Sequence, residues 1–168
     1  PMFETMVAYN MTEHLYGHTF DPPEAPLGYT RVLAPWRRPY RTSDGYVCML
    51  AYVDIQWRRF WTEVGRPELA DDPRFDTLSN RSDNISELYR IAGECLTGQS
   101  TAYWIERLAA LDIPSAPITS LEELETDPHL TKIDFFRKRK HPTEGDIVLP
   151  DNPVRYSRTE PDLHHFQP

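Results

Sequence analysis

The chain has 168 residues, and its 18 Lys and Arg against 26 Asp and Glu give a formal net charge of −8 at pH 7. This acidic balance argues against a general nucleic-acid binder, because such proteins gain affinity mainly by neutralising phosphates. The sequence has no run of about 18 apolar residues, the length that a membrane-spanning helix needs. No signal peptide is visible at the N-terminus.

Composition favours one cytoplasmic domain with long ordered connections. Only two cysteines occur, Cys48 and Cys95, so a reducing setting is expected, with both thiols buried in packing. Proline is unusually frequent at 16 residues, roughly twice its ~5% share. The prolines punctuate segments throughout the chain, which indicates connections that lie along other surfaces.

Residues 3–15 have apolar side chains at helical spacing, so a helix is predicted there, with Gly17 as a C′ residue that ends it. The apolar content is heavy for an exposed arm. Pro1 enters this helix pattern with no lead-in. We therefore expect the helix to pack against material that precedes Pro1 in a longer protein.

Residues 18–39 form a connector rich in proline. Connections of this length are uncommon in compact domains and are usually functional loops or linkers. One interpretation is a stiff segment that crosses the surface of a partner domain or subunit. Another is an anion site at Trp36, Arg37 and Arg38, which flanking prolines would hold rigid, although salt bridges to acidic loops explain these arginines as well. The prolines of the connector stand at positions 22, 23, 26, 35 and 39.

Residues 41–61 predict a β-hairpin that leads into an amphipathic helix. Asp44 and Gly45 supply the positive φ that hairpin turns need. Apolar side chains alternate along the second strand, and bulky ones recur every three or four residues in the helix. The strand side chains are Val47, Met49 and Ala51 on one face and Cys48 and Leu50 on the other; the helix face is Trp57, Phe60, Trp61 and Val64.

Asp54 stands at the start of this helix and has two plausible roles. As an N-cap it would accept hydrogen bonds from the first free N–H groups, and its removal would cost about 1 kcal/mol. As a carboxylate facing a substrate cleft it could be a general base. Spacing alone favours the cap.

The remaining segments complete a predicted α+β fold: a small antiparallel-sheet domain with flanking helices and long linker arms. Helices are expected from Ser82 or Asp83 to Thr97 and from Ser100 to Leu111, followed by an extended run at 113–118. Ser120 and Glu123 fit a capping box. Asp127 and Pro128 begin another helical turn. A hairpin over residues 135–149 and an extended run at 153–157 follow.

Common catalytic motifs are absent from the sequence, including phosphate-binding glycine loops, the nucleophile elbow and the zinc-protease helix. No metal site is expected, because His164 and His165 alone are too few ligands. The basic run Arg137–Lys140 alternates between two faces of a predicted strand. We interpret it as a solvated edge strand, with a phosphate contact as the alternative.

Three stretches resemble one known family, the CaiB/BaiF group of family III CoA-transferases. Tyr40-Arg-Thr-Ser-Asp-Gly-Tyr-Val with Asp54-Ile-Gln-Trp resembles its "Y-x-T-x-DG-Y…D-x-QW" element. Ile113 to Leu130 resembles its "IPxAPV…DP" segment. Pro153-Val-Arg-Tyr-Ser, continuing to Pro161, is similar to its closing motif. Jointly and in this order, the three stretches are specific.

The resemblance implies a Rossmann-like large domain, a small α+β domain and linkers that thread two subunits into an interlocked homodimer. On that basis residues 1–39 are the helix and linker arm from the large domain. Residues 40–112 are the small domain, and residues 113–168 are the return linker and C-terminal segment on the large domain. Met2 and Glu4 match the family's sequence after its nucleophilic Asp, which would precede Pro1.

The implied chemistry is CoA transfer between an acyl-CoA and a carboxylic acid, both substrates, with no covalently bound cofactor. The carboxylate nucleophile attacks the thioester to give a mixed anhydride, and CoA thiolate returns to form an aspartyl-CoA thioester. The acceptor acid repeats the cycle. This chain, which lacks the nucleophile, is expected to be inactive alone.

Two alternatives to CoA transfer stay open, one within the same family and one outside it. Racemases of the same family move the α-proton, and Asp54 lines up with an acidic position there, so it is a catalytic candidate. A non-catalytic interaction module is the other alternative. The family's glycine loop before the hairpin is replaced here by Leu33–Pro39, which puts transfer to formyl- or oxalate-type acids in doubt. Trp36, Arg37 and Arg38 are the expected CoA-binding residues.

Overall fold

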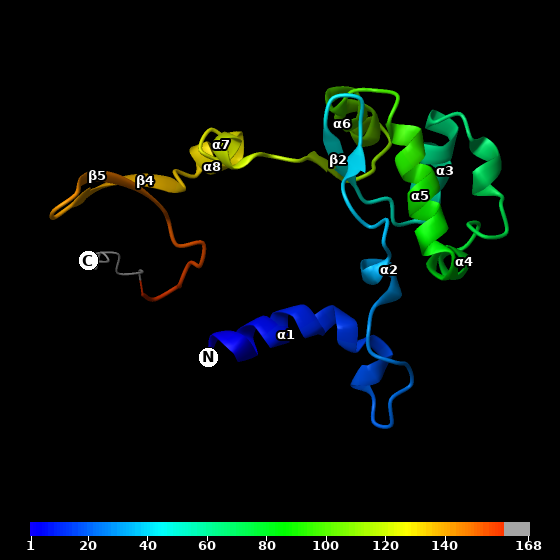
Figure 1. Ribbon diagram of the computed structural model, residues 1–168, viewed down its shortest axis with the longest axis horizontal. Helices are drawn as coiled ribbons and strands as arrows, with labels where there is room; N and C mark the ends of the chain where they lie inside the picture. The colour runs from blue at the N-terminus through cyan, green and yellow to red at the C-terminus, as the bar shows by residue number, and fades with distance from the viewer. Residues whose placement is uncertain (160–168) are drawn as a thin grey trace. The chain divides into compact units, whose positions relative to one another are not determined.

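The computed structural model describes residues 1–159, which divide by their contacts into two units, residues 1–118 and the residues from Thr119 onward (Figure 1). The predicted α+β class is confirmed, because helices and small antiparallel sheets are combined. Among the described residues, no helix has the length and apolarity needed to cross a membrane.

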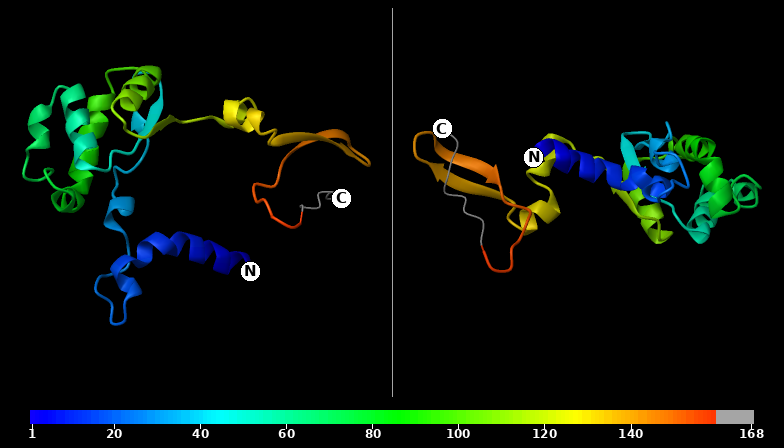
Figure 2. Two further views of the ribbon diagram at one scale, coloured as in Figure 1. Left: turned by 180° about the vertical axis from the view of Figure 1, so that it is seen from behind. Right: turned by 90° about the horizontal axis from the view of Figure 1, so that it is seen from below.

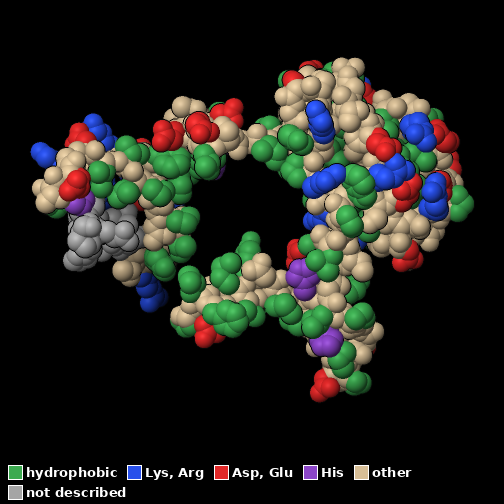
Figure 3. Space-filling view, in the orientation of Figure 1, with side chains coloured by type: hydrophobic (Ala, Val, Ile, Leu, Met, Phe, Trp, Pro, Cys, Tyr) green, Lys and Arg blue, Asp and Glu red, His purple; other side chains and the backbone are tan. Residues whose placement is uncertain are grey.

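The first unit begins with the predicted N-terminal helix, α1 (Met2–Leu15), followed by a 3-10 turn at Tyr16–Thr19 and the short α2 (Thr30–Leu33). No residue of α1 is buried, and its apolar side chains form an exposed surface (Figure 3). Gly17 is not the left-handed C′ residue that was predicted. Tyr16 takes the positive φ of 37° instead. Gly17 leaves room for Ala25, whose Cβ would lie 2.6 Å from an added Cβ.

The predicted hairpin forms the centre of a three-stranded antiparallel sheet. Strand β1 (Tyr40–Arg41) pairs with β2 (Tyr46–Met49), and β2 pairs with β3 (Ser115–Pro117). Val47 is fully buried and Cys48 is exposed, so the predicted alternation is confirmed. Residues 113–118 therefore lie with the first unit by their contacts, and the chain reaches the second unit only after β3.

The turn between β1 and β2 works differently from the prediction. Gly45 does not have a positive φ. A Cβ there would lie 3.2 Å from the hydroxyl oxygen of Thr101, so the glycine permits a close approach. Asp44 accepts hydrogen bonds from the backbone N–H of Thr101 at 2.8 Å and from its hydroxyl at 3.1 Å. The turn is thus tied to the start of a distant helix.

Helices α5 and α6 pack against this sheet, α4 packs against α5, and helices α3 to α6 supply most of the core (Figures 1 and 2). In α3 (Asp54–Glu63) the predicted face is buried, with Trp57 and Trp61 stacked at 5.5 Å between ring centroids. The 3-10 turn Pro67–Ala70 follows. In α6 (Thr101–Ala110) the predicted start at Ser100 is confirmed, since its hydroxyl accepts from the N–H of Tyr103. The largest fully buried side chains are Trp61, Phe60, Phe75, Leu88, Leu96, Leu108 and Val47.

The helix predicted from Ser82 or Asp83 is in fact two helices, α4 (Leu78–Asp83) and α5 (Ile85–Leu96). Thr77 caps α4, because its side chain accepts from the N–H of Asn80. Asn84 separates the helices, and its side-chain amide donates to the Asn80 carbonyl at 2.9 Å. Ser82 and Asp83 therefore end one helix and cap neither.

The second unit, considered by itself, holds two short helices and a hairpin. The capping box is confirmed at α7 (Leu121–Leu124), and Asp127 caps α8 (Pro128–Lys132) with Pro at the first helical position. Strands β4 (Phe136–His141) and β5 (Gly145–Pro150) form the predicted hairpin. Two basic side chains of β4 form ion pairs, Arg137 with Asp151 and Lys138 with Asp146. The end of the closing motif at Pro161 lies outside the described residues.

Candidate functional site

The loop before β1 holds the predicted arginines in a fixed turn. The backbone N–H of Arg37 donates to the Ala34 carbonyl at 2.9 Å, and that of Arg38 donates to the Trp36 carbonyl at 2.9 Å. The Arg38 guanidinium lies 4.5 Å from the centre of the Trp36 ring, a cation–π contact. Ala34 is buried and anchors the loop in the core. Both arginines are therefore fixed at the edge of the sheet.

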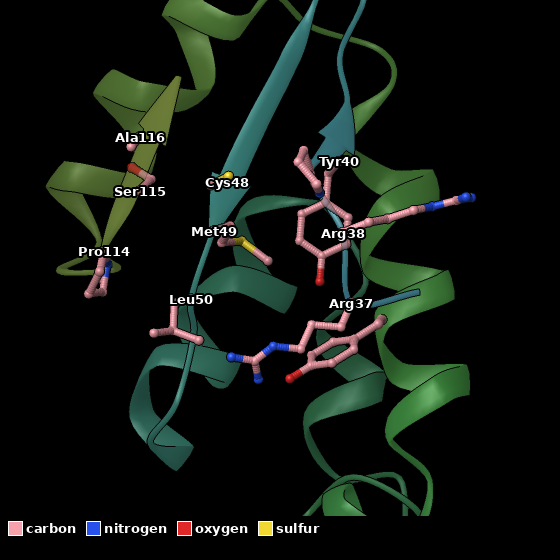
Figure 4. A pocket seen from close by; sticks show the side chains of 11 residues that line it. Arg37, Arg38, Tyr40, Cys48, Met49, Leu50, Pro114, Ser115 and Ala116 are labelled. Atoms are coloured by element: carbon pink, nitrogen blue, oxygen red, sulfur yellow. The ribbon is translucent and has the colours of Figure 1, made fainter. Parts of the chain in front are cut away.

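A cavity of about 490 Å³ opens beside this loop, within the size range of small-molecule sites. The Arg37 side chain extends toward Leu50 across the cavity, whereas Arg38 points the other way (Figure 4). The remaining walls are mostly apolar, so the cavity combines one cationic edge with apolar sides. They comprise Pro39, Tyr40, Cys48, Met49, Leu50, Tyr89, Pro114, Ser115 and Ala116.

Tyr40 is a wall residue that the sequence did not single out. Its side chain is buried against α5, where Gly93 makes room: a Cβ on Gly93 would lie 3.1 Å from the Tyr40 ring. Burial, followed by the neighbouring Tyr89, raises the pKa of Tyr40 far above its ordinary value. The phenol is therefore neutral and can donate a hydrogen bond. A glycine within the apolar face of a helix was the available signal.

A second cavity of about 400 Å³ adjoins the first, because both are lined by Arg38, Pro39, Tyr40 and Tyr89. Trp36 lines this second cavity only. Arg90, also in its wall, is engaged in ion pairs with Glu87 and Glu94. The structure thus brings Trp36, Arg37 and Arg38 together, around two neighbouring cavities.

Asp54 is neither the N-cap that was predicted nor a wall of the Arg37 cavity. Val53 occupies the N-cap position, and Asp54 is the first helical residue. Gln56 performs the capping, accepting from the backbone N–H groups of Tyr52 at 2.8 Å and Val53 at 3.3 Å. The Asp54 carboxylate instead pairs with Arg81, whose side chain is only 3% exposed. Sequence spacing gave no sign of this partner, 27 residues away.

The two cysteines differ from the prediction that both are buried. Cys48 is exposed and contributes to the wall of the Arg37 cavity. Cys95 is half-buried, and burial raises the pKa of its thiol. The exposure of Cys48 follows from the alternation along β2, which directs Val47 into the core and its neighbour outward.

Within residues 1–159, no three His, Cys, Asp or Glu side chains gather as a metal ion would require. His164 and His165 lie outside the described residues.

Comparison with known proteins places these features in a family context. The family model of CoA-transferase family III matches residues 1–168. The chain is 28% identical over 119 residues to succinyl-CoA:glutarate CoA-transferase of Homo sapiens, covering 71% of this chain and 27% of that protein. It is 29% identical over 133 residues to cinnamoyl-CoA:phenyllactate CoA-transferase of Clostridium sporogenes, covering 77% and 32%.

A further relative is formyl-CoA:oxalate CoA-transferase of Streptomyces avermitilis, 30% identical over 115 residues, which covers 67% of this chain and 28% of that protein. The chain thus spans between 27% and 32% of the length of these relatives.

Among solved structures, a CAIB/BAIF family protein from Brucella suis has the same fold, with a TM-score of 0.65 over 94% of this chain and 40% of that one, at 22% identity. The orthorhombic form of Rv3272 from M. tuberculosis has a TM-score of 0.60 at 26% identity, covering 71% and 33%.

Proposed function

This chain belongs to CoA-transferase family III, and from that premise we propose that it is part of an enzyme that transfers CoA between an acyl-CoA and a carboxylic acid. The observation that carries the proposal is the Arg37 cavity. Its cationic edge and apolar walls suit an anionic group attached to an apolar chain. Acyl-CoA and organic acids both have that character.

The bond-making residue of this scheme is an acidic nucleophile that precedes Pro1. The chain spans about a third or less of the relatives it matches, which supports a division of labour between an upstream nucleophile and this segment. The working enzyme is then an interlocked cytoplasmic homodimer, and the chain alone is inactive. Residues 1–39 are proposed to be the helix and linker arm that come from the large domain, and residues 113–168 the return linker and C-terminal segment that pack on it.

Within the site, Arg37 is proposed to hold the carboxylate or thioester oxygen of the substrate, and Tyr40 to donate a hydrogen bond beside it. Trp36 and Arg38 form the stacked pair that keeps the loop in place. Because backbone hydrogen bonds hold this loop, it is not suited to the large movements of a glycine loop. Acceptor acids larger than oxalate are therefore expected.

The test is a CoA-transfer assay on the complete protein, with Arg37→Ala compared to wild type. Loss of a charge-assisted hydrogen bond predicts a decrease of about 10- to 100-fold in kcat/KM. Arg58→Ala is the matched control, since Arg58 forms only an exposed pair with Asp71, and its kcat/KM should stay at the wild-type value. Equal activity of Arg37→Ala and wild type would refute the role of Arg37.

The same assay separates transfer from racemisation. A family III racemase would exchange the α-proton of an acyl-CoA with deuterium from solvent, without any acceptor acid. CoA transfer that depends on an acceptor, with no such exchange, is the expected result. Exchange without transfer would replace the proposed function by racemisation.

A further inference from the structure

Arg31, on α2, is a charged side chain in an unusual setting. The residue is only 6% exposed, although arginine is rarely buried unless it is paired. Among the described residues no carboxylate forms an ion pair with it; the Tyr89 phenol interacts with the guanidinium, and the Nε has no hydrogen-bond partner. The guanidinium charge is thus left without a counter-charge, and its Nε is a donor that a further group can satisfy. The neighbours of Arg31 should therefore reveal what that group is.

Aromatic rings surround this guanidinium. Its Cζ lies 5.1 Å from the centre of the Tyr52 ring. Both residues line a cavity of about 320 Å³. Tyr16 and Tyr29, also in the wall, stack at 5.5 Å between ring centres, and the His14 ring accepts a hydrogen bond from the backbone N–H of Tyr29. Arg31 is the single charged residue in this wall. The other lining residues are Ala25, Pro26, Gly28, Thr30, Leu78 and Ser82.

We propose that this cavity binds a small monocarboxylate with an aromatic or apolar body. A guanidinium presents its donors in a rigid fork that matches a carboxylate. One guanidinium balances one negative charge, so a multiply charged phosphate ester would leave buried charge uncompensated. Tyrosine rings and aliphatic groups suit the body of such an acid.

This second cavity is distinct from the Arg37 cavity, because the two share no lining residue; Tyr89, in the wall of the Arg37 cavity, contacts Arg31 from the other side. The inference therefore goes beyond CoA transfer and does not depend on it. A site of this kind could be occupied by an acid that never accepts CoA. Its occupancy can be measured by binding alone, without any catalytic assay.

Benzoate is the probe, titrated calorimetrically into the full chain, with benzyl alcohol and inorganic phosphate in parallel titrations. Because the Arg37 cavity also suits an acid with an apolar body, the titrations are made on the Arg37→Ala chain. There benzoate should bind at one site, and the other two probes should bind at least tenfold more weakly. Arg31→Lys keeps the charge but loses the fork, and should weaken benzoate binding by about tenfold or more. Arg58→Lys is the matched control, because Arg58 forms an exposed pair with Asp71 and does not line this cavity; it should leave this binding unchanged.

A second cavity variant keeps the test valid if Arg31→Lys, a substitution at a buried residue, fails to fold. Leu78 lines the cavity but is 45% exposed, so Leu78→Trp should fold and, by narrowing the cavity, weaken benzoate binding. Circular dichroism confirms that each variant is folded. The proposal is overturned if benzoate binds the wild-type chain but not the Arg37→Ala chain, or if it binds neither. It is also overturned if benzyl alcohol or phosphate binds equally well, or if both cavity variants, made in the Arg37→Ala chain, bind benzoate as that chain does.

Discussion

Asp54 and Arg81 form the ion pair that the fold needs at the start of α3. The Arg81 side chain is 3% exposed, and it also donates to the Phe75 carbonyl at 2.9 Å. Asp54 is 66% exposed, so solvent reaches one side of the pair and screens it. The pair nevertheless contributes to the free energy of folding, because without Asp54 the buried charge of Arg81 would be unpaired, which is costly. The geometry thus favours a structural role for Asp54.

Asp54→Asn tests this role. We expect the free energy of unfolding to fall by about 1–3 kcal/mol, between the values for surface and buried pairs, while turnover of the complete enzyme is unchanged. Urea denaturation and a CoA-transfer assay measure the two quantities. Asp71→Asn removes an exposed surface pair with Arg58 and should cost less than about 1 kcal/mol. A large loss of turnover in Asp54→Asn, with stability retained, would restore the general-base hypothesis.

At the scale of elements, Gly93 sets the contact between α5 and β1. Its missing side chain leaves space for the Tyr40 ring, which forms part of the cavity wall. Gly93→Ala gains up to about 1 kcal/mol of helix propensity but crowds a buried ring, at a cost of about 1–3 kcal/mol. We expect the free energy of unfolding, measured by thermal denaturation, to fall by about 1 kcal/mol. Substrate binding should also become weaker.

Gly98→Ala is the matched control for that substitution. Gly98 lies just after α5, and a Cβ there would have nothing within 4 Å. The variant should be as stable as wild type or slightly more stable. If Gly93→Ala were equally harmless, the close approach of Tyr40 would not be needed for the fold.

The turn between β1 and β2 gives the first unit a defined acid sensitivity. Hydrogen bonds from Thr101, first from its backbone N–H, hold the pKa of Asp44 below its ordinary value. A carboxylate with a lowered folded pKa contributes stability that is complete above the unfolded pKa of about 4 and is lost as the pH falls through the folded pKa.

Asp44→Asn should therefore flatten the dependence of the thermal midpoint on pH between about pH 5 and pH 2. Wild type should lose stability more steeply than the variant over this interval, and the two curves should converge at the acid end. Asp83→Asn is the comparison, since the side chain of Asp83, at the end of α4, forms no ion pair or hydrogen bond with the residues described. Parallel curves for wild type and Asp44→Asn would rule out this link.

Elements with a local signal were predictable, and long-range contacts were not. The aromatic face of α3, the cap at Ser100 and the capping box at Ser120 follow from spacing of three and four residues. The division between α4 and α5 was missed, because Thr77 and Asn84 act through bonds that spacing does not reveal. The loop of Trp36, Arg37 and Arg38 was singled out by its composition, and its role in binding CoA stays a prediction.

Other parts of the site depend on residues that meet only in the folded chain. Tyr40 joins the cavity through Gly93, more than fifty positions later, and Asp54 pairs with Arg81. The burial of Arg31 has no local signal at all, since a single arginine in a proline-rich connector predicts an exposed side chain. Tertiary packing decided each of these positions.

For the whole molecule, α1 is the helix whose apolar side chains have no packing partner in the core of the described residues. None of its residues is buried, and Met2, Phe3 and Met6 are 84%, 76% and 55% exposed. Figure 3 shows the apolar surface that this helix presents. A contiguous apolar surface of this kind marks an interaction site or a tendency to aggregate. We therefore expect the chain as given to self-associate through α1.

The double variant Phe3→Gln/Met6→Gln tests this expectation, because glutamine preserves helix propensity while removing apolar surface. Sedimentation velocity over a range of concentrations should show association of wild type and much less association of the variant. The thermal midpoint of the core should not change, since neither side chain touches it. Tyr156→Gln, which removes an apolar side chain 61% exposed in the second unit, should associate like wild type. A wild-type chain that stays monomeric throughout would mean that the exposed face of α1 is tolerated in water, and the need for a partner surface would then lack support.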